Sequence, residues 1–276
     1  MKLPARRLRF LEHSIDGLRA GLDLALDAEN SAAAGGFLQR LDARVKVAGL
    51  FSLILAAALA TRLWVIAAIF AAAVVLAALS RVSLRVLATR VWIGAFAFTG
   101  AIALPALVLT PGAALYHVPG LGWTITAQGL TTAGFLLLRV ETAATLALLL
   151  VFTTPWMQVL KALRVLRVPV VAVAILGMAS RYILLLLETA HDMFESRRSR
   201  TVGPLDGAAR RRIAVASAGV LLSRSFQLSD EVFLAMQARG FRGEVHVLDD
   251  FAMRRLDWLA LACFAVLAAA AVWAGR

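Results

Sequence analysis

Five long runs of apolar residues, separated by short charged or polar stretches, constrain this chain more than any other feature of its sequence. The runs are Val45–Ala60, Leu63–Leu79, Val91–Thr110, Gly129–Thr153 and Leu256–Trp273. A helix that crosses a bilayer needs about 20 mostly apolar residues, with a range of roughly 17–25. We therefore expect an all-α, polytopic membrane protein with five transmembrane helices.

The composition agrees with a lipid environment for much of the chain. Apolar residues make up 61% of the sequence and charged residues 17%, whereas a soluble domain has roughly 45–50% and about 25%. These values exclude a soluble enzyme and a disordered chain. A single cysteine, Cys263, excludes a disulfide-stabilised secreted scaffold. No apolar run follows the basic N-terminus before Val45, so we expect no cleavable signal peptide.

The basic residues indicate how the chain is oriented. The formal net charge is +12, which in a soluble protein would favour nucleic acid as a partner. In a membrane protein it favours positively charged cytoplasmic segments instead, so we expect no nucleic-acid partner. Basic residues at the start of the first run and between the second and third are Arg40, Arg44, Lys46, Arg81, Arg85 and Arg90. We therefore place the N-terminus in the cytoplasm and the uncharged segment 111–128 in an external loop.

A sixth apolar stretch, Val168–Leu187, is ambiguous because it contains Arg181. An arginine at the centre of a spanning helix costs about 2.5–3.5 kcal/mol on the insertion scale. If this stretch crossed the membrane, residues 188–255 with their eleven arginines would lie outside, against the positive-inside rule. We therefore expect residues 154–255 to be cytoplasmic, with 169–187 lying against or partly inside the membrane-facing core.

Three helices are expected within residues 154–255. Pro155 suits a helix start and Pro169 stops that helix, a second helix runs from Val170 to Arg200, and a third from Asp206 to Ala238. Asp206 is a suitable N-cap, and Gly240 is placed to end the third helix in a left-handed conformation. One apolar stripe of the third helix consists of Leu221, Leu228, Val232, Ala235 and Met236.

Both long helices end in arginines flanked by small residues. The second helix closes with Ser196-Arg197-Arg198-Ser199-Arg200, and the third with Ala238-Arg239-Gly240. One interpretation is ordinary capping, because a cation is favoured at the negative end of the helix dipole. The functional interpretation is a guanidinium offered to acidic groups of a partner protein.

Three motifs resemble those of a known family, the T components of energy-coupling factor (ECF) transporters. The motifs are Leu41-Asp42-Ala43-Arg44-Val45-Lys46, Arg181-Tyr182 followed by Leu185-Leu186-Leu187-Glu188 and the arginine cluster, and Ala235-Met236-Gln237-Ala238-Arg239-Gly240-Phe241. The similarity covers about residues 40–260. Length and N-terminal extension are most similar to the CbiQ type, the T component of cobalt importers.

The resemblance implies a non-catalytic subunit that couples ATP hydrolysis by other subunits to uptake. Its implied partners are two cytosolic ATPases (CbiO-like) and a substrate-binding membrane subunit (CbiM-like, with a CbiN-like protein), in a bacterial inner membrane. Such a chain binds no cofactor, because ATP and Mg²⁺ belong to the ATPases. The ATPase-docking positions carried over are Ala238, Arg239, Gly240, Ser196, Arg197, Ser199 and Arg200. Within the arginine cluster 196–200, Arg200 aligns best with the family's docking arginine and Arg197 next. Cobalt is the implied cargo, with nickel and biotin as alternatives.

The sequence contains no Gly-x-x-x-x-Gly-Lys-[Ser/Thr] phosphate-binding loop, so the energy must come from a partner. No catalytic set or metal-ligand spacing occurs, and His117 is interpreted as an ordinary loop residue. A stand-alone secondary transporter is the alternative, supported by Arg139 and Glu141 within one span; Arg139 could also lie near the interface or pair within the bundle. The expected organisation is an amphipathic surface arm (1–40), four spans (41–153), cytoplasmic coupling helices (154–255) and a final span (256–276).

Overall fold

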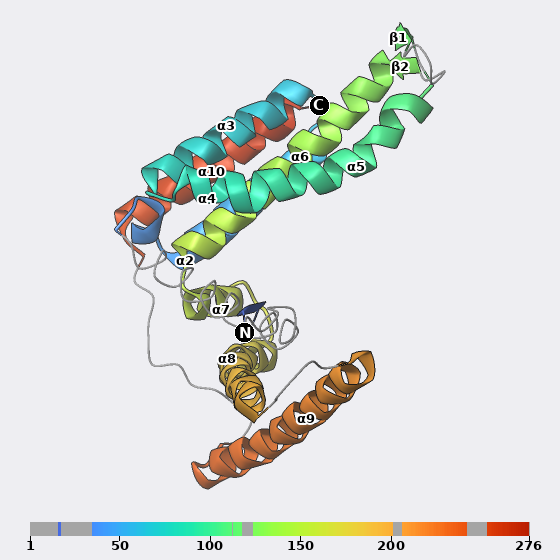
Figure 1. The fold of residues 1–276 in the computed structure, drawn as a ribbon. Coiled ribbons are helices and arrows are strands. Elements are labelled where there is room, and N and C mark those ends of the chain that lie inside the picture. Colours follow the sequence, from blue (N-terminus) through green and yellow to red (C-terminus); the bar gives the residue numbers. More distant parts are fainter. Residues whose placement is uncertain are drawn as a thin grey trace. The chain divides into compact units, whose positions relative to one another are not determined.

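The computed structural model describes residues 16–17, 35–111, 113–117, 124–200, 206–241 and 253–275 (Figure 1). The chain forms two compact units. One, the span unit, comprises residues 28–162 and 250–276, and the other, the helix-pair unit, comprises residues 1–27 and 163–249. Of the predicted surface arm over residues 1–40, all but residues 16–17 and 35–40 lie outside the described residues.

The span unit is helical, as the sequence predicts. Its elements are η1 (Leu38–Arg40), α2 (Ala43–Leu59), α3 (Leu63–Leu79), α4 (Leu84–Leu87), the π-helical stretch η2 (Ala88–Trp92), α5 (Ile93–Leu109), β1 (Ala114–His117), β2 (Thr124–Thr126), α6 (Ala127–Thr153) and α10 (Arg255–Ala274). Helix α7 (Trp156–Val165) is divided between the two units, and its residues up to Ala162 belong to the span unit. Each of the five predicted apolar runs forms a helix, and their bounds agree with the prediction to within two residues.

The connector between the second and third runs is shorter than predicted. α3 ends in a left-handed turn at Arg81 (φ 55°), where the Val82 amide donates to the Ala77 carbonyl over 3.1 Å. Helix resumes at Leu84 and continues through η2 into α5. Leu87 and Val91 are 0% and 5% exposed, so this stretch has an apolar side that packs in the core despite its arginines.

Segment 111–128, which the sequence predicts as an external loop, contains two short strands among its described residues. β1 and β2 pair in an antiparallel fashion, with Ala114 opposite Thr126 and His117 opposite Thr124. Thr126 caps α6, because its hydroxyl accepts a hydrogen bond from the Gly129 amide over 3.0 Å. This cap starts α6 at Ala127, two residues before the predicted run.

α6 lies at the centre of the span unit and packs against α2, α3 and α5, while α10 packs against α2 (Figure 1). The core contains the fully buried Leu50, Ile66, Leu146 and Leu149. Gly49 permits close approach of α2 and α10, because a Cβ at this position would collide with the Phe264 ring. Small residues allow such close backbone approach between helices in lipid.

The segment just before α2 closes the end of α3. The Phe37 amide donates to the Leu79 carbonyl over 3.3 Å, and the Gln39 side-chain amide donates to the Ser80 carbonyl over 3.0 Å. Leu38 is 0% exposed. Residues 36–40 therefore pack as part of the span unit, and do not form a separate surface arm.

The helix-pair unit is built on two long helices whose bounds match the prediction. They are α8 (Val170–Arg200) and α9 (Gly207–Ala238). Asp206 caps α9, with its carboxylate accepting from the Ala209 amide over 2.6 Å. α7 begins after Pro155 and ends in a left-handed turn at Arg167 (φ 68°) before Pro169.

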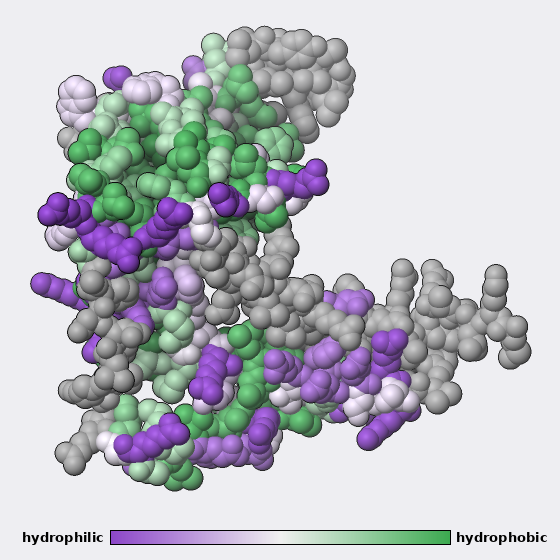
Figure 2. Space-filling view, turned by 90° about the vertical axis from the view of Figure 1, so that its left-hand side faces the viewer, coloured by the Kyte–Doolittle hydropathy of each residue, from purple (hydrophilic) through white to green (hydrophobic). Residues whose placement is uncertain are grey.

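Three helices in the described part of the chain are long and apolar enough to cross a membrane, namely α6, α8 and α10. α3 and Ile93–Leu107 of α5 are apolar but shorter. Figure 2 shows hydrophobic side chains spread over the span unit, with a row of hydrophilic side chains across one end. That α8 is among the helices apolar enough to cross a membrane agrees with the apolar character of 169–187. The position of this segment against the membrane stays a prediction.

Candidate functional site: two arginine-bearing helix ends

The predicted docking tripeptide lies at the C-terminus of α9. Arg239 is the C-cap, and Gly240 has the left-handed φ of 77° that the sequence predicts. The Phe241 amide donates to the Met236 carbonyl over 3.0 Å, and the Gly240 amide donates to the Gln237 carbonyl over 2.9 Å. This pair of bonds is a Schellman motif, in which glycine avoids the steric cost of a side chain at positive φ.

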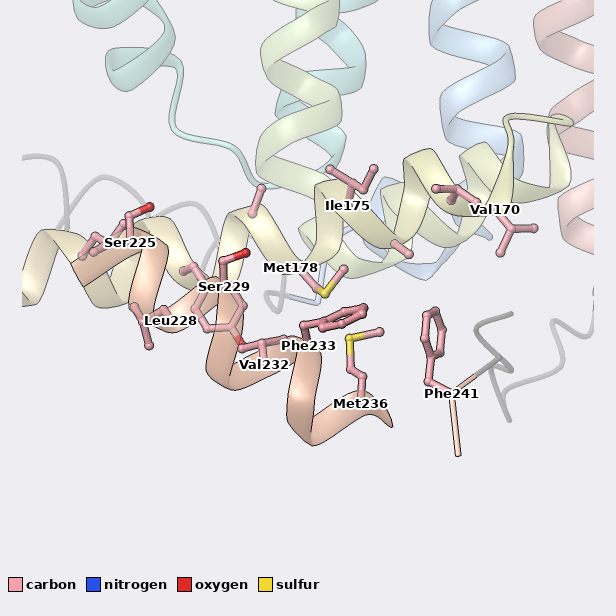
Figure 3. A pocket seen from close by; sticks show the side chains of 15 residues that line it. Val170, Ile175, Met178, Ser225, Leu228, Ser229, Val232, Phe233, Met236 and Phe241 are labelled. Carbon is pink, nitrogen blue, oxygen red and sulfur yellow. The ribbon is translucent and has the colours of Figure 1, made fainter. Parts of the chain in front are cut away.

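Apolar contacts hold this helix end in place. Met236 and Phe241 line a cavity of about 500 Å³ between α9 and the first half of α8, together with Val170 and Met178 (Figure 3). A contact between the residues at these two positions commonly accompanies a Schellman motif. Arg239 is exposed on the fixed turn, so its guanidinium is available to a partner.

The first docking motif occupies the last turn of α8. Arg197 is half-buried, whereas Arg198 and Arg200 are exposed. The Ser199 hydroxyl donates to the Ser196 carbonyl over 2.8 Å, which satisfies one carbonyl of this turn. Arg200 is the last helical residue of α8, and Arg239 is the C-cap of α9. Exposure therefore separates Arg198 and Arg200 from Arg197, and the docking role of each arginine stays a prediction.

The two arginine-bearing ends lie far apart. Phe241, two residues after Arg239, lies beside Val170 and Val171 at the start of α8, whereas Arg200 lies at the other end of the same helix. At 1.5 Å per residue, the intervening 30 residues span about 45 Å. One acidic groove cannot hold both ends, so each end is suited to a separate partner surface.

The stripe predicted on α9 is largely confirmed. Leu221, Leu228, Val232 and Met236 are all half-buried, and the last three line the cavity. Ala235 is exposed, which corrects its place in the stripe. Ser225, also half-buried, takes the position between Leu221 and Leu228 that a helical period of three and four residues demands.

Comparison with known proteins decides the family. A family model described as "Cobalt transport protein", CbiQ, matches residues 35–247. This chain belongs to the CbiQ family. An uncharacterised protein of Methanocaldococcus jannaschii is 32% identical over 215 residues, which cover 76% of this chain and 73% of the relative. The CbiQ match includes both arginine motifs. As a CbiQ-family protein the chain is the T component of an ECF transporter, a non-catalytic transmembrane coupling subunit that functions with ATPase and substrate-binding subunits.

The two charges inside the α6 span of this CbiQ-family protein do not pair with each other. Arg139 Nη2 donates to the Ala60 carbonyl, the C-cap of α2, over 2.8 Å. Glu141 is 9% exposed, and its Oε2 has no hydrogen-bond partner in the described part of the chain. Of the alternatives for Arg139, pairing within the bundle is confirmed. Helix capping accounts for Arg139, one of the two charges that favoured a stand-alone secondary transporter, and leaves Glu141 without an assigned role.

Among the described residues, no three His, Cys, Asp or Glu side chains lie close enough to hold a metal ion. His117 is the last residue of β1. Cys263 is exposed on α10 as a free thiol.

Nothing in the sequence indicates that Lys46 is a buried structural residue. It was interpreted only as one of the basic residues that orient the chain, yet its side chain is 0% exposed. Asp257, which is 3% exposed, accepts hydrogen bonds from the Asp42 and Arg254 amides. Its position as the one acidic residue in the last apolar run is a signal that could have drawn attention to it.

Proposed function

We propose that this chain couples two cytosolic ATPases to a substrate-binding membrane subunit, through Arg239 on one ATPase and Arg200 on the other. The observation that carries the proposal is the separation of two exposed, arginine-bearing helix ends by about 45 Å on one pair of packed helices. Arginine suits such contacts because its guanidinium forms directed, bidentate hydrogen bonds with carboxylates.

Cobalt is the proposed cargo, and the family description supports it. The proposed location is the cytoplasmic membrane, with the N-terminus and both arginine-bearing ends in the cytosol. The distribution of Lys and Arg along the chain supports this orientation.

The docking proposal is tested with Arg239→Glu in the complex that the chain forms with its ATPases and substrate-binding subunit. Loss of one partner from a desolvated ion pair costs about 3–5 kcal/mol, so we expect at least a hundredfold weaker ATPase binding with normal membrane insertion. Arg212→Glu is the matched control, because Arg212 is exposed near the other end of α9. Normal ATPase binding and uptake by the Arg239→Glu complex would refute the docking role.

The cargo and the orientation have separate tests. ATP-dependent uptake of radioactive cobalt, competed by nickel or biotin, identifies the cargo. A cysteine at Arg239, in a chain whose Cys263 is replaced by serine, should resist a membrane-impermeant thiol reagent added to intact cells. Labelling from outside would place α9 on the wrong side of the membrane for any contact with an ATPase.

A further inference from the structure

A buried lysine ties the end of α6 to the start of α2. Lys46 Nζ donates to the Thr153 carbonyl over 2.8 Å, and both side chains are 0% exposed. Thr153 is the last residue of α6, so the ammonium lies at the negative end of that helix. A cation is favoured there, and it satisfies a carbonyl that the helix itself leaves free.

Two carboxylates extend this contact into a polar cluster. Asp42 caps α2, with Oδ1 accepting from the Arg44 amide over 2.9 Å. Asp257 Oδ1 accepts from the Asp42 amide over 2.9 Å, and Oδ2 accepts from the Arg254 amide over 2.8 Å. The starts of α2 and α10 and the end of α6 are therefore joined at one place in the span unit.

The same turns of α2 hold the next helix along the chain. Only Thr154 and Pro155 separate α6 from α7. On α7, Ala162 is 0% exposed and packs, with Val159, against Ala43 and Val47. Ala43 and Val47 lie on either side of Lys46 along α2. The joint between α6 and α7 is thus held by an ammonium–carbonyl bond on one side and by apolar contacts on the other.

We propose that Lys46 is a positioning residue that fixes the direction in which α7 leaves α6. From α7 the chain continues directly into α8, which carries one docking arginine and packs against the helix that carries the other. The chain joins these helices to the span unit at two places, once through α7 and once between α9 and α10, and in this proposal the load applied by the ATPases is carried through α7. With Lys46 in place, the load moves α2 and α6; without it, Thr154 and Pro155 bend and absorb the movement. This role rests on the coupling function proposed above.

A residue of this kind differs from one that only stabilises the fold. A purely stabilising residue affects how much complex assembles, whereas a residue that positions the joint affects how much substrate enters for each ATP hydrolysed. The test therefore measures both quantities on the same liposomes, which contain the whole complex of this chain, its ATPases and its substrate-binding subunit.

The first variant is Lys46→Met, which keeps an unbranched side chain one atom shorter and removes the charge and the donors. We expect assembly and ATP hydrolysis within a factor of two of the unaltered complex, with at least tenfold less substrate taken up per ATP. Ser52→Ala is the matched control on α2, because the Ser52 hydroxyl bonds only within its own turn, to the Gly49 carbonyl. Unchanged uptake per ATP in the Lys46→Met complex would overturn the proposal.

A second variant covers the case in which Lys46→Met does not assemble. Thr154→Gly with Pro155→Gly loosens the linker beyond the Thr153 carbonyl that Lys46 holds. The direction of α7 is then no longer fixed although Lys46 is intact, so the same loss of uptake per ATP is expected. An assembled complex of this variant with unchanged uptake per ATP would equally overturn the proposal. Failure of the coupling function itself looks different, because the unaltered complex would then show no ATP-dependent uptake.

Discussion

Lys46 on α2 and Arg139 on α6 each donate a hydrogen bond to the C-terminal end of the other helix. The acceptors are the Thr153 and Ala60 carbonyls, each 2.8 Å from its donor. Both intervals, from Lys46 to Ala60 and from Arg139 to Thr153, are 14 residues long. The two antiparallel helices are therefore fixed in register at both ends of a shared length of about 21 Å.

Replacement of Arg139 by methionine should destabilise the span unit. The change leaves the Ala60 carbonyl without its charged donor, and a hydrogen bond to a charged group contributes about 1.5–3 kcal/mol. We expect a lower midpoint of thermal unfolding for the chain in detergent. Arg139→Lys keeps the charge but not the planar guanidinium, so its unfolding midpoint should lie between those of the unaltered chain and of Arg139→Met. An unchanged midpoint in Arg139→Met would show that the bond contributes nothing to stability.

Gly240→Ala should weaken the docking end of α9. At φ 77° an alanine is strained by about 1–2 kcal/mol, which frays the turn that holds Arg239 and should reduce ATPase binding severalfold. The reverse change is available at Arg167, which occupies the left-handed position after α7 with φ 68°. Arg167→Gly should therefore raise the unfolding midpoint. Titration with the ATPases measures the effect of Gly240→Ala, and thermal unfolding measures that of Arg167→Gly. ATPase binding by Gly240→Ala equal to that of the unaltered chain would contradict the first prediction.

Asp257→Ala should open the starts of α2 and α10 together. It removes the acceptor for the Asp42 and Arg254 amides, and a buried donor left unsatisfied costs about 1–3 kcal/mol. Faster hydrogen exchange is expected at both amides at once, with that of the Leu146 amide on α6 as an internal reference. Asp257→Asn keeps one acceptor oxygen and should slow exchange relative to alanine. Protection that persists at Asp42 would mean that another group accepts its hydrogen.

Much of the fold follows from local sequence patterns. Apolar runs located the helices of the span unit, because the length of a spanning segment is set by the bilayer. Pro155, Pro169, Asp206 and Gly240 located α7, α8 and α9, since each residue type has a distinct effect on helix ends.

The contacts between distant segments could not be predicted in the same way. Asp42 and Asp257 are 215 residues apart in the sequence, and nothing local indicates that their helices start side by side. Lys46 is indistinguishable in sequence from a solvated basic residue that orients a membrane protein. The helical residues 84–90 lie between two predicted runs and are not indicated by an apolar run of their own. The apolar side of this helix is narrow and interrupted by arginines.

At the predicted docking residues, the turn at Gly240 could be predicted from the sequence, whereas the burial of the individual arginines of α8 could not. Gly240 has a conformation that few residues accept, so its identity implies its geometry. Arg197, Arg198 and Arg200 differ only in the direction in which the helix turns them, and burial of Arg197 becomes visible only in the folded chain.

The cavity where α8 and α9 cross is lined mainly by aliphatic, aromatic and thioether side chains. Such contacts have no preferred direction, and methionine in particular adapts to altered surroundings. The crossing can therefore serve as a pivot. Rotation of one helix over the other exchanges one set of apolar neighbours for another. Arg239 lies beside the cavity, whereas Arg200 lies 14 residues beyond Leu186 on α8, about 21 Å away, so the same rotation displaces the Arg200 end of α8 more than the turn at Arg239.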